Sequence, residues 1–233
     1  MSSNYAVFLR HGDYHHQAAT PGACQPYPLN KAGEEQAVAS IQKLLAFTER
    51  HHLTIAPSVH SSLLLRAWQT ADIICQQLHH RDIERHYAVM ESAQLNERSV
   101  GSLANLTISQ IEQIVADDPR YPATPAGWKS DSYYQLPYPG AESLMDAGMR
   151  MAEYINKRMA QLSAQTGCLH IFIGHGAAFR HAAYQQQMIT FADIAKLSMF
   201  HAEPLFFTLN PTLQWHHVAG DWKIRSSHSS YTD

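Results

Sequence analysis

Two short apolar runs in the sequence each lead into a histidine followed by glycine. Residues 5–9 (YAVFL) run into Arg-His-Gly at 10–12, and residues 169–173 (LHIFI) run into Gly-His-Gly at 174–176. Runs of this length are typical of buried strands, and glycine lets the backbone approach a ligand closely. An isolated His-Gly at a strand end is usually a turn. Two copies, one with an adjoining arginine, favour a functional site.

These residue types have a defined chemistry. Histidine can act as a nucleophile or as an acid and base, and the planar fork of arginine binds oxyanions through paired hydrogen bonds. If the two strands are neighbours in a sheet, we expect both imidazoles to face one pocket.

Several further blocks resemble the histidine phosphatase superfamily, whose best-known branch is the cofactor-dependent phosphoglycerate mutases. LRHG at 9–12 resembles the signature of this family, and the other blocks follow in the family's order. They are PLNKAG at 28–33, SSLLLRAWQTA at 61–71, LNER at 95–98, GAES at 140–143, and GHG at 174–176 with Arg180. One signature alone would be weak, but the blocks together span roughly residues 5–180.

The resemblance implies roles for five residues. His11 would attack phosphorus and become a phosphohistidine, which divides one difficult displacement into two easier ones. Arg10, Arg66 and His175 would bind the phosphoryl oxygens, where charge develops in the transition state. Glu97 would protonate the leaving oxygen and then activate water as a base.

Some of these assignments have alternatives. Arg66 could be a surface arginine on an amphipathic helix. Glu97 could be a solvated loop carboxylate, in which case Asp13 or Glu142 would be the acid. The place of Arg66 inside the family block disfavours the surface position, and Glu97 is favoured over the two substitutes.

Four residues are candidates for binding the substrate beside the five catalytic ones. Gln17 stands where the family often has an asparagine that touches phosphate. The other three are Arg98, Gly176 and Ala177, from the blocks that carry Glu97 and His175.

Departures from the mutase pattern favour a phosphatase. Alanines follow the second histidine at 177–178, where mutases carry polar residues, and the loop after the first signature lacks the sequence that is characteristic of mutases. The basic cluster of the mutase insertion is reduced to Arg120 and Lys129. Tyrosines and Trp128 in this segment suggest a more apolar leaving group, or packing under the loop.

The hydrophobic pattern predicts alternating strands and helices. We expect a helix from Lys31 to about Arg50 with Asn30 as its N-cap, and a second helix over 64–78. Strands are expected at 58–61, entered through Pro57, and at 86–90, 206–209, 214–218 and 222–225. A long helix should span 144–162. This order predicts an α/β fold, a three-layer α/β/α sandwich with a mostly parallel central sheet.

The proline-rich stretch at about 94–140 reads as an insertion over the sheet. It contains five prolines, and we expect one short helix, starting at the capping box Thr107-x-x-Gln110. The stretch is too short and too rich in proline for us to expect a hydrophobic core of its own. The prediction is therefore one domain over 1–233 with 94–140 as a lid.

Composition limits the classes of function. The chain has 233 residues, 17 Lys+Arg and 20 Asp+Glu, and a formal net charge of −3, so nothing global attracts nucleic acid or an anionic membrane. Three widely spaced cysteines and no signal-like N-terminus favour the cytoplasm. The expected partner is a phosphorylated small molecule, and the oligomeric state, a homodimer included, stays open.

The 16 histidines raise the question of a metal site. Adjacent pairs such as His15-His16 point in different directions and chelate poorly, and no fixed ligand spacing is present. We therefore expect no metal and no cofactor.

The sequence thus predicts a phosphomonoester hydrolase, a phosphatase of the phosphoglycerate-mutase-like type, acting through a phosphohistidine on His11. The alternatives are a phosphoglycerate-type mutase, a non-catalytic member that binds a phosphorylated ligand, and a metal-dependent hydrolase. The non-catalytic alternative is disfavoured because all five catalytic residue types are present.

Overall fold

A six-stranded sheet forms the centre of the molecule. The computed structural model describes residues 4–161, 167–210 and 212–225. The strand order is β3-β2-β4-β1-β6-β7. The first four of these pair in parallel, and β6 and β7 add antiparallel strands at one edge. The strands are β1 (Asn4–Arg10), β2 (Thr54–Ser61), β3 (Ala88–Glu91), β4 (Cys168–Gly174), β6 (Leu205–Leu209) and β7 (Trp215–Ala219).

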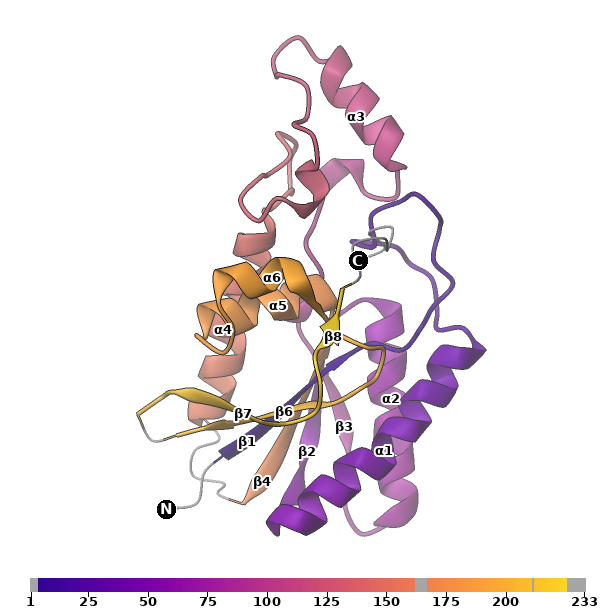
Figure 1. The fold of residues 1–233 in the computed structure, drawn as a ribbon. Coiled ribbons are helices and arrows are strands. Elements are labelled where there is room, and N and C mark those ends of the chain that lie inside the picture. Colours follow the sequence, from indigo (N-terminus) through magenta and orange to yellow (C-terminus); the bar gives the residue numbers. More distant parts are fainter. Residues whose placement is uncertain (1–3, 162–166, 211, 226–233) are drawn as a thin grey trace.

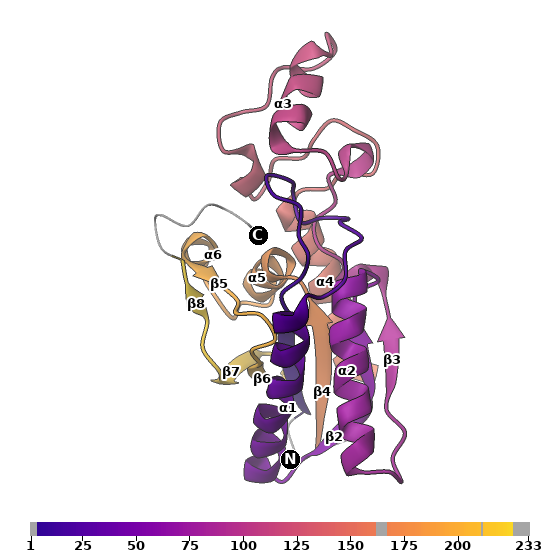
Figure 2. The same ribbon diagram turned by 90° about the vertical axis from the view of Figure 1, so that its right-hand side faces the viewer.

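Helices cover both faces of this sheet (Figures 1 and 2). Side chains of β1 alternate between the faces, as they must in a strand. Val7 and Leu9 join the cluster beneath α1 (Lys31–His51) and α2 (Leu65–Arg81). Phe8 joins the opposite cluster beneath α4 (Leu144–Gln161) and α5 (Gly176–Gln185). The three-layer α/β/α fold with a mostly parallel sheet, expected from the sequence, is confirmed.

Local signals place most helix boundaries correctly. The Asn30 side chain accepts a hydrogen bond from the Gly33 amide at 2.9 Å, which caps α1 as predicted. The prediction that Pro57 stands before its strand is wrong, because the residue lies inside β2. The pairing of β2 with β4 shifts register between Ile55 and Val59, and such an irregularity tolerates a proline without an N–H.

The C-terminal part contains elements that the sequence pattern did not reveal. A short helix, α6 (Phe191–Lys196), precedes β5 (Leu197–Ser198). Strand β8 (Lys223–Ile224) pairs with β5 in a separate two-stranded sheet and does not extend the central one. Helix α4 is described to Gln161, so the last residue of its expected span lies outside the described residues.

The segment at about 94–140 contains α3 (Ile108–Asp117) and three 3-10 turns, at Ala93–Leu95, Gly101–Leu103 and Trp128–Ser130. Thr107 and Gln110 form the predicted capping box. The expectation that this segment lacks a core is wrong, because Trp128, 2% exposed, packs with Ile111, Val115 and other apolar side chains. The segment projects beyond the sheet at the top of Figure 1, and its role as a lid stays a prediction.

Candidate active site

The two histidine motifs meet at the carboxyl ends of β1 and β4. These strands are parallel neighbours, with Arg10 in register with Gly174. The His11 amide donates to the Gly174 carbonyl at 3.0 Å, so the pairing continues into the motifs. The imidazole rings of His11 and His175 lie 5.0 Å apart between centroids. The two imidazoles therefore lie side by side, and the expectation that they face one pocket stays a prediction.

Hydrogen bonds fix the tautomer of His11. Its Nδ1 lies 2.7 Å from the carbonyl oxygen of Gly12, which can only accept, so Nδ1 carries the proton. Its Nε2 lies 3.1 Å from Nε of Arg66, which can only donate. Nε2 therefore presents a lone pair toward the arginine, as a nucleophilic nitrogen requires.

The backbone around His11 is held by close contact with α1. A Cβ on Gly33 would lie 1.9 Å from the carbonyl oxygen of Asp13, and one on Gly12 would lie 2.4 Å from the carbonyl oxygen of Gly33. The Gly12 amide also donates to the Thr70 hydroxyl of α2 at 3.0 Å. Two helices thus fix the turn that carries His11.

A chain of hydrogen bonds orients His175. Its Nδ1 lies 3.3 Å from a terminal nitrogen of Arg66, and its Nε2 lies 2.8 Å from the Ser62 hydroxyl. That hydroxyl donates onward to Oδ1 of Asn96 at 2.9 Å. Because the guanidinium can only donate, His175 carries its proton on Nε2 and turns Nδ1 toward the site.

Arg66 is not a surface residue. It is 1% exposed at the start of α2, so the surface alternative is excluded. Besides the two histidines, its guanidinium donates to backbone carbonyls of the 22–25 loop, at 2.6 Å from Gly22 and 3.0 Å from Gln25. Its Cζ lies 4.6 Å from the ring centre of Tyr14, a cation–π contact.

Burial and positive charge keep both imidazoles neutral. The pKa of His11 lies well below its usual value, first because of burial and then because of the Arg66 and Arg10 charges. Burial and the two arginines lower the pKa of His175 in the same way. A bound phosphoryl anion would act in the opposite direction on both groups.

Arg10 closes another side of the cluster. It is 8% exposed, and its guanidinium donates to the Met199 carbonyl at 3.2 Å. Arg10 directly precedes His11, and a Cβ on Gly176, the residue after His175, would lie 3.4 Å from Cδ of Arg10. Arg10, His11, Arg66 and His175 therefore form one buried cationic cluster.

Glu97 lies at the N-terminus of α5. Its carboxylate accepts from the amides of Ala177 at 3.3 Å and Ala178 at 3.2 Å, and from its neighbour Arg98 at 2.9 Å. The Ala177 and Ala178 amides follow closely after His175, the N-cap of α5, so the carboxylate lies beside the second histidine motif. Ala177 is one of the residues expected to bind substrate, and its amide donates to Glu97 in this structure.

The two substitute acids are held in other ways. Asp13 is 45% exposed in its side chain and accepts from the Asn30 amide nitrogen at 2.9 Å. Glu142 forms a salt bridge with Arg150 at 2.6 Å. Both carboxylates serve local structure, and Glu97 alone of the three lies against α5.

A cavity of about 270 Å³ adjoins Glu97. Arg98, 5% exposed, lines it, and its guanidinium lies 5.6 Å from the ring centre of Trp128. Three further cationic side chains line the cavity, Lys129, Arg180 and Arg225, together with apolar Phe191 and Ile194. Arg120, the other residue of the reduced basic cluster expected in the insertion, does not line this cavity and pairs with Asp118.

Three of the four expected substrate-binding residues lie beside the cavity or the arginines. Arg98 and Ala177 line the cavity, and Gly176 begins α5, where a Cβ would lie 3.4 Å from Cδ of Arg10. Gln17 is exposed, and its side-chain oxygen accepts from the Tyr27 hydroxyl at 3.4 Å. The structure does not bring Gln17 into the cluster.

Three residues near the nucleophile were not assigned from sequence. The Tyr14 ring lies 5.2 Å from that of His11, and Ser62 orients His175. His201 donates from Nδ1 to the His11 carbonyl at 2.9 Å. Ser62 stands inside a recognised block, whereas nothing in the sequence connects His201 with a turn 190 residues away.

Within the described ranges, no group of three His, Cys, Asp or Glu side chains is arranged to hold a metal ion. In the same part of the chain, every helix is too short or too polar to cross a bilayer.

Together these features define an α/β protein with a buried cationic site at the carboxyl end of its parallel strands. The family model of the histidine phosphatase superfamily (branch 1) matches residues 6–205. The chain belongs to this superfamily.

The chain is similar in sequence to mutases and in fold to phosphatases. A 2,3-bisphosphoglycerate-dependent phosphoglycerate mutase of Bartonella tribocorum is 25% identical over 209 residues, 88% of this chain and 92% of the relative. A solved mycobacterial hydrolase shares the fold with a TM-score of 0.69, at 20% identity over 98% of this chain and 94% of the other. A mycobacterial glucosyl-3-phosphoglycerate phosphatase in complex with VO3 has a TM-score of 0.63 at 22% identity, with 92% and 96% covered.

Proposed function

We propose that this protein hydrolyses a phosphomonoester through a phosphohistidine on His11. The observation that carries the proposal is the orientation of this imidazole. Its Nδ1–H donates to Gly12 and leaves Nε2 as the nucleophilic nitrogen beside Arg66. A neutral imidazole in this state can attack phosphorus without first losing a proton.

Arg10 and Arg66 would neutralise the charge that develops on the phosphoryl oxygens. Both are buried, and donors fixed away from water stabilise such charge more than solvated ones. The hydrogen bond from Nε of Arg66 to Nε2 of His11 would have to break as Nε2 attacks. The Arg66 Nε–H would then be free to donate to a phosphoryl oxygen. The His175 ring, neutral when the site is empty, would add a donor if the bound anion raised its pKa enough to protonate it.

Glu97 would act as the general acid and then as the general base. In the first step it would protonate the leaving oxygen, and in the second it would take a proton from the water that attacks the phosphohistidine. Its place supports this role, since it lines the cavity in which a leaving group can lie. The P–O bond of the ester breaks as the P–N bond forms, and hydrolysis then returns His11 and releases phosphate.

Trapping the intermediate tests the proposal. Wild-type protein quenched during turnover of a labelled phosphate ester should carry an acid-labile, base-stable phosphoryl group. His11→Ala should form no adduct and lose turnover, while His80→Ala, a change at an exposed position of α2, should behave like the wild type. An adduct that persists in folded His11→Ala would disprove the assignment.

A phosphoglycerate-type mutase is the second candidate, and the cavity supports it. Arg98, Lys129, Arg180 and Arg225 line the space beside Glu97, which suits a leaving group with its own negative charge. The alanines after His175 still favour the phosphatase. In the assay, the enzyme receives 3-phosphoglycerate and a trace of 2,3-bisphosphoglycerate. Rapid formation of 2-phosphoglycerate with little free phosphate would reverse the order of the candidates.

A further inference from the structure

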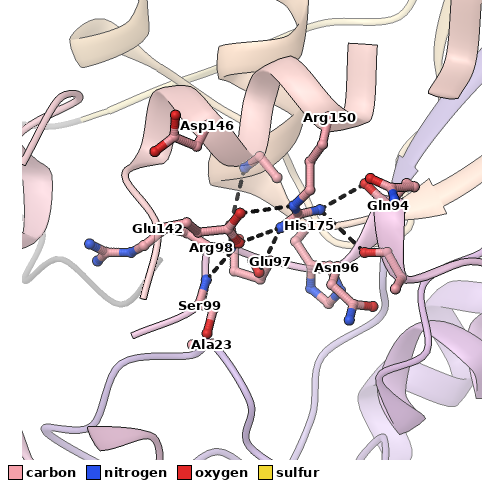
Figure 3. A network of polar contacts seen from close by, with 12 residues as sticks. Ala23, Gln94, Asn96, Glu97, Arg98, Ser99, Glu142, Asp146, Arg150 and His175 are labelled. Carbon is pink, nitrogen blue, oxygen red and sulfur yellow. Dashed lines mark hydrogen bonds and ion pairs between the residues drawn. The ribbon is translucent and has the colours of Figure 1, made fainter. Parts of the chain in front are cut away.

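One arginine of α4 holds the segment that carries Glu97. Arg150 donates to three backbone carbonyls of this segment, those of Ala93 at 3.3 Å, Gln94 at 2.7 Å and Glu97 at 3.1 Å. Figure 3 shows the side chain reaching from the helix to the segment. Three carbonyls in a stretch of five residues thus share one rigid donor group, and the last belongs to Glu97.

Arg150 is itself fixed by Glu142. The guanidinium and the carboxylate form two parallel hydrogen bonds, at 2.6 Å and 3.0 Å, and both side chains are 20% exposed. The bidentate geometry defines the orientation of the guanidinium plane as well as its position. Glu142 Oε1 also accepts from the Ser99 amide at 2.9 Å, two residues beyond Glu97. The ion pair therefore holds the chain on both sides of Glu97.

The side chain of Glu97 is held separately, by the amides at the start of α5. Its carboxylate is directed toward α5, while its backbone carbonyl is directed toward Arg150 on α4. The placement of the carboxylate thus depends on two anchors, from two helices that pack closely against each other. A Cβ on Gly148 of α4 would lie 2.3 Å from Cβ of His181 in α5.

We propose that Arg150, fixed by Glu142, is the positioning residue for Glu97. The inference rests on the proposed role of Glu97 as the proton donor. A proton donor works only within hydrogen-bond reach of the leaving oxygen, and a displacement near 1 Å can cost about 100-fold in rate. Without the arginine, three carbonyls lose a donor, although Ala93 keeps its bond from the Asn96 amide, and the segment can move relative to α5.

The test compares two kinds of leaving group. Arg150→Met should lower kcat/KM for an alkyl phosphate by roughly 10- to 100-fold, since the poor leaving group needs the proton. It should leave 4-nitrophenyl phosphate within about twofold, because a nitrophenolate departs without one. Arg150→Lys keeps the charge without the fork and should give an intermediate loss. This variant also covers the case in which Arg150→Met does not fold.

Arg158→Met is the matched control. Arg158 lies on the same helix and donates a hydrogen bond to Gln161, so its replacement removes the same charge without touching the Glu97 segment. This variant should have the same effect on kcat/KM for both substrates. Glu142→Gln, which keeps an acceptor for Ser99 but loses the ion pair, should show the same selective loss as Arg150→Lys.

A double variant separates positioning from a general effect. If Arg150 acts through Glu97, adding Arg150→Met to Glu97→Gln should cause little further loss on the alkyl ester. Equal losses on both substrates, no loss on either, or additive losses in the double variant would overturn the inference. A different result, the absence of the phosphoenzyme from wild-type protein, would contradict the proposed function. Turnover of 4-nitrophenyl phosphate by the variants would show that their phosphoryl transfer to His11 is intact.

Discussion

His170 provides a quantitative test of how burial affects stability. The residue lies on β4 and is 0% exposed, and by strand alternation it faces the same side as Phe172. A neutral imidazole has one donor and one acceptor, and neither ring nitrogen has a hydrogen-bond partner among the described residues. Burial lowers the pKa of His170 from 6.5 to about 4.

The sign of the pH effect follows from the direction of this shift. The folded state favours the neutral ring, whereas the unfolded chain takes up a proton near pH 6.5. The contribution to stability is therefore complete above pH 6.5 and is lost as the pH falls toward 4. With a folded pKa of about 4, His170 costs about 2 kcal/mol of the free energy of unfolding between pH 7.5 and pH 5.

His170→Leu should remove this cost and add a second gain. At pH 7.5 the variant should be more stable by roughly 1–3 kcal/mol, because two unsatisfied buried polar atoms disappear. Between pH 7.5 and pH 5 it should lose about 2 kcal/mol less than the wild type. Urea unfolding followed by circular dichroism at both pH values measures the two effects.

His60 separates these two effects. Burial also lowers its pKa to about 4, but only its Nε2 lacks a hydrogen-bond partner among the described residues, because its Nδ1 lies 3.0 Å from the Tyr154 hydroxyl. His60→Leu should therefore weaken the pH dependence with a smaller gain at pH 7.5 than His170→Leu. If wild type and His170→Leu lose the same stability on acidification, the reasoning from burial is refuted.

Three other results are expected. Glu97→Gln should slow an alkyl phosphate by about 10²–10⁴-fold and a nitrophenyl phosphate far less; equal losses in steady-state assays would point to another acid. A chelator should leave turnover unchanged, because arginine side chains provide the positive charge that a metal would supply; activity that disappears and returns with Mg²⁺ or Zn²⁺ would contradict the mechanism. Gly148→Ala should lower the free energy of unfolding by about 1–3 kcal/mol, since the new methyl meets His181 in α5. Exposed Met149→Ala is its control, and equal stability of both variants would count against this close packing.

Much of the fold could be predicted from the sequence because its signals are local. Asn30 caps α1 and Thr107 starts α3 through bonds to residues three positions away, and such bonds can be recognised from spacing. The apolar runs at β1 and β4 are buried on both faces, as parallel strands require. β5 and β8 have two residues each, and a strand this short has no periodicity to detect.

The residues of the candidate site also differ in how far the sequence could predict them. His11, Arg66, Glu97 and His175 stand in recognisable blocks, so their types and order could be predicted. The partners of these residues come from distant parts of the chain. The Gly12 carbonyl orients His11 from the next residue, but His201 reaches the same turn from beyond α6. Contacts that arise from the three-dimensional path of the chain leave no trace in local spacing.

The positive charge around the cavity could not be predicted from the sequence. The insertion contains few basic residues, which suggested weak binding of an anion. Arg180 comes from α5 and Arg225 follows β8, so neither belongs to the insertion, yet both line the cavity. A charge that acts at one point in space can be assembled from several elements, and a count along the sequence does not measure it.

The contact between Gly12 and Gly33 has a consequence for engineering. At either position a single methyl would collide with backbone atoms of the other segment, and no change of a neighbouring side chain can relieve that collision. A mutant library that randomises these positions should return glycine at both, whatever substrate is used for selection. Variation aimed at a new substrate is better directed to side chains lining the cavity, such as Lys129 and Phe191, where a change leaves the turn of the nucleophile as it is.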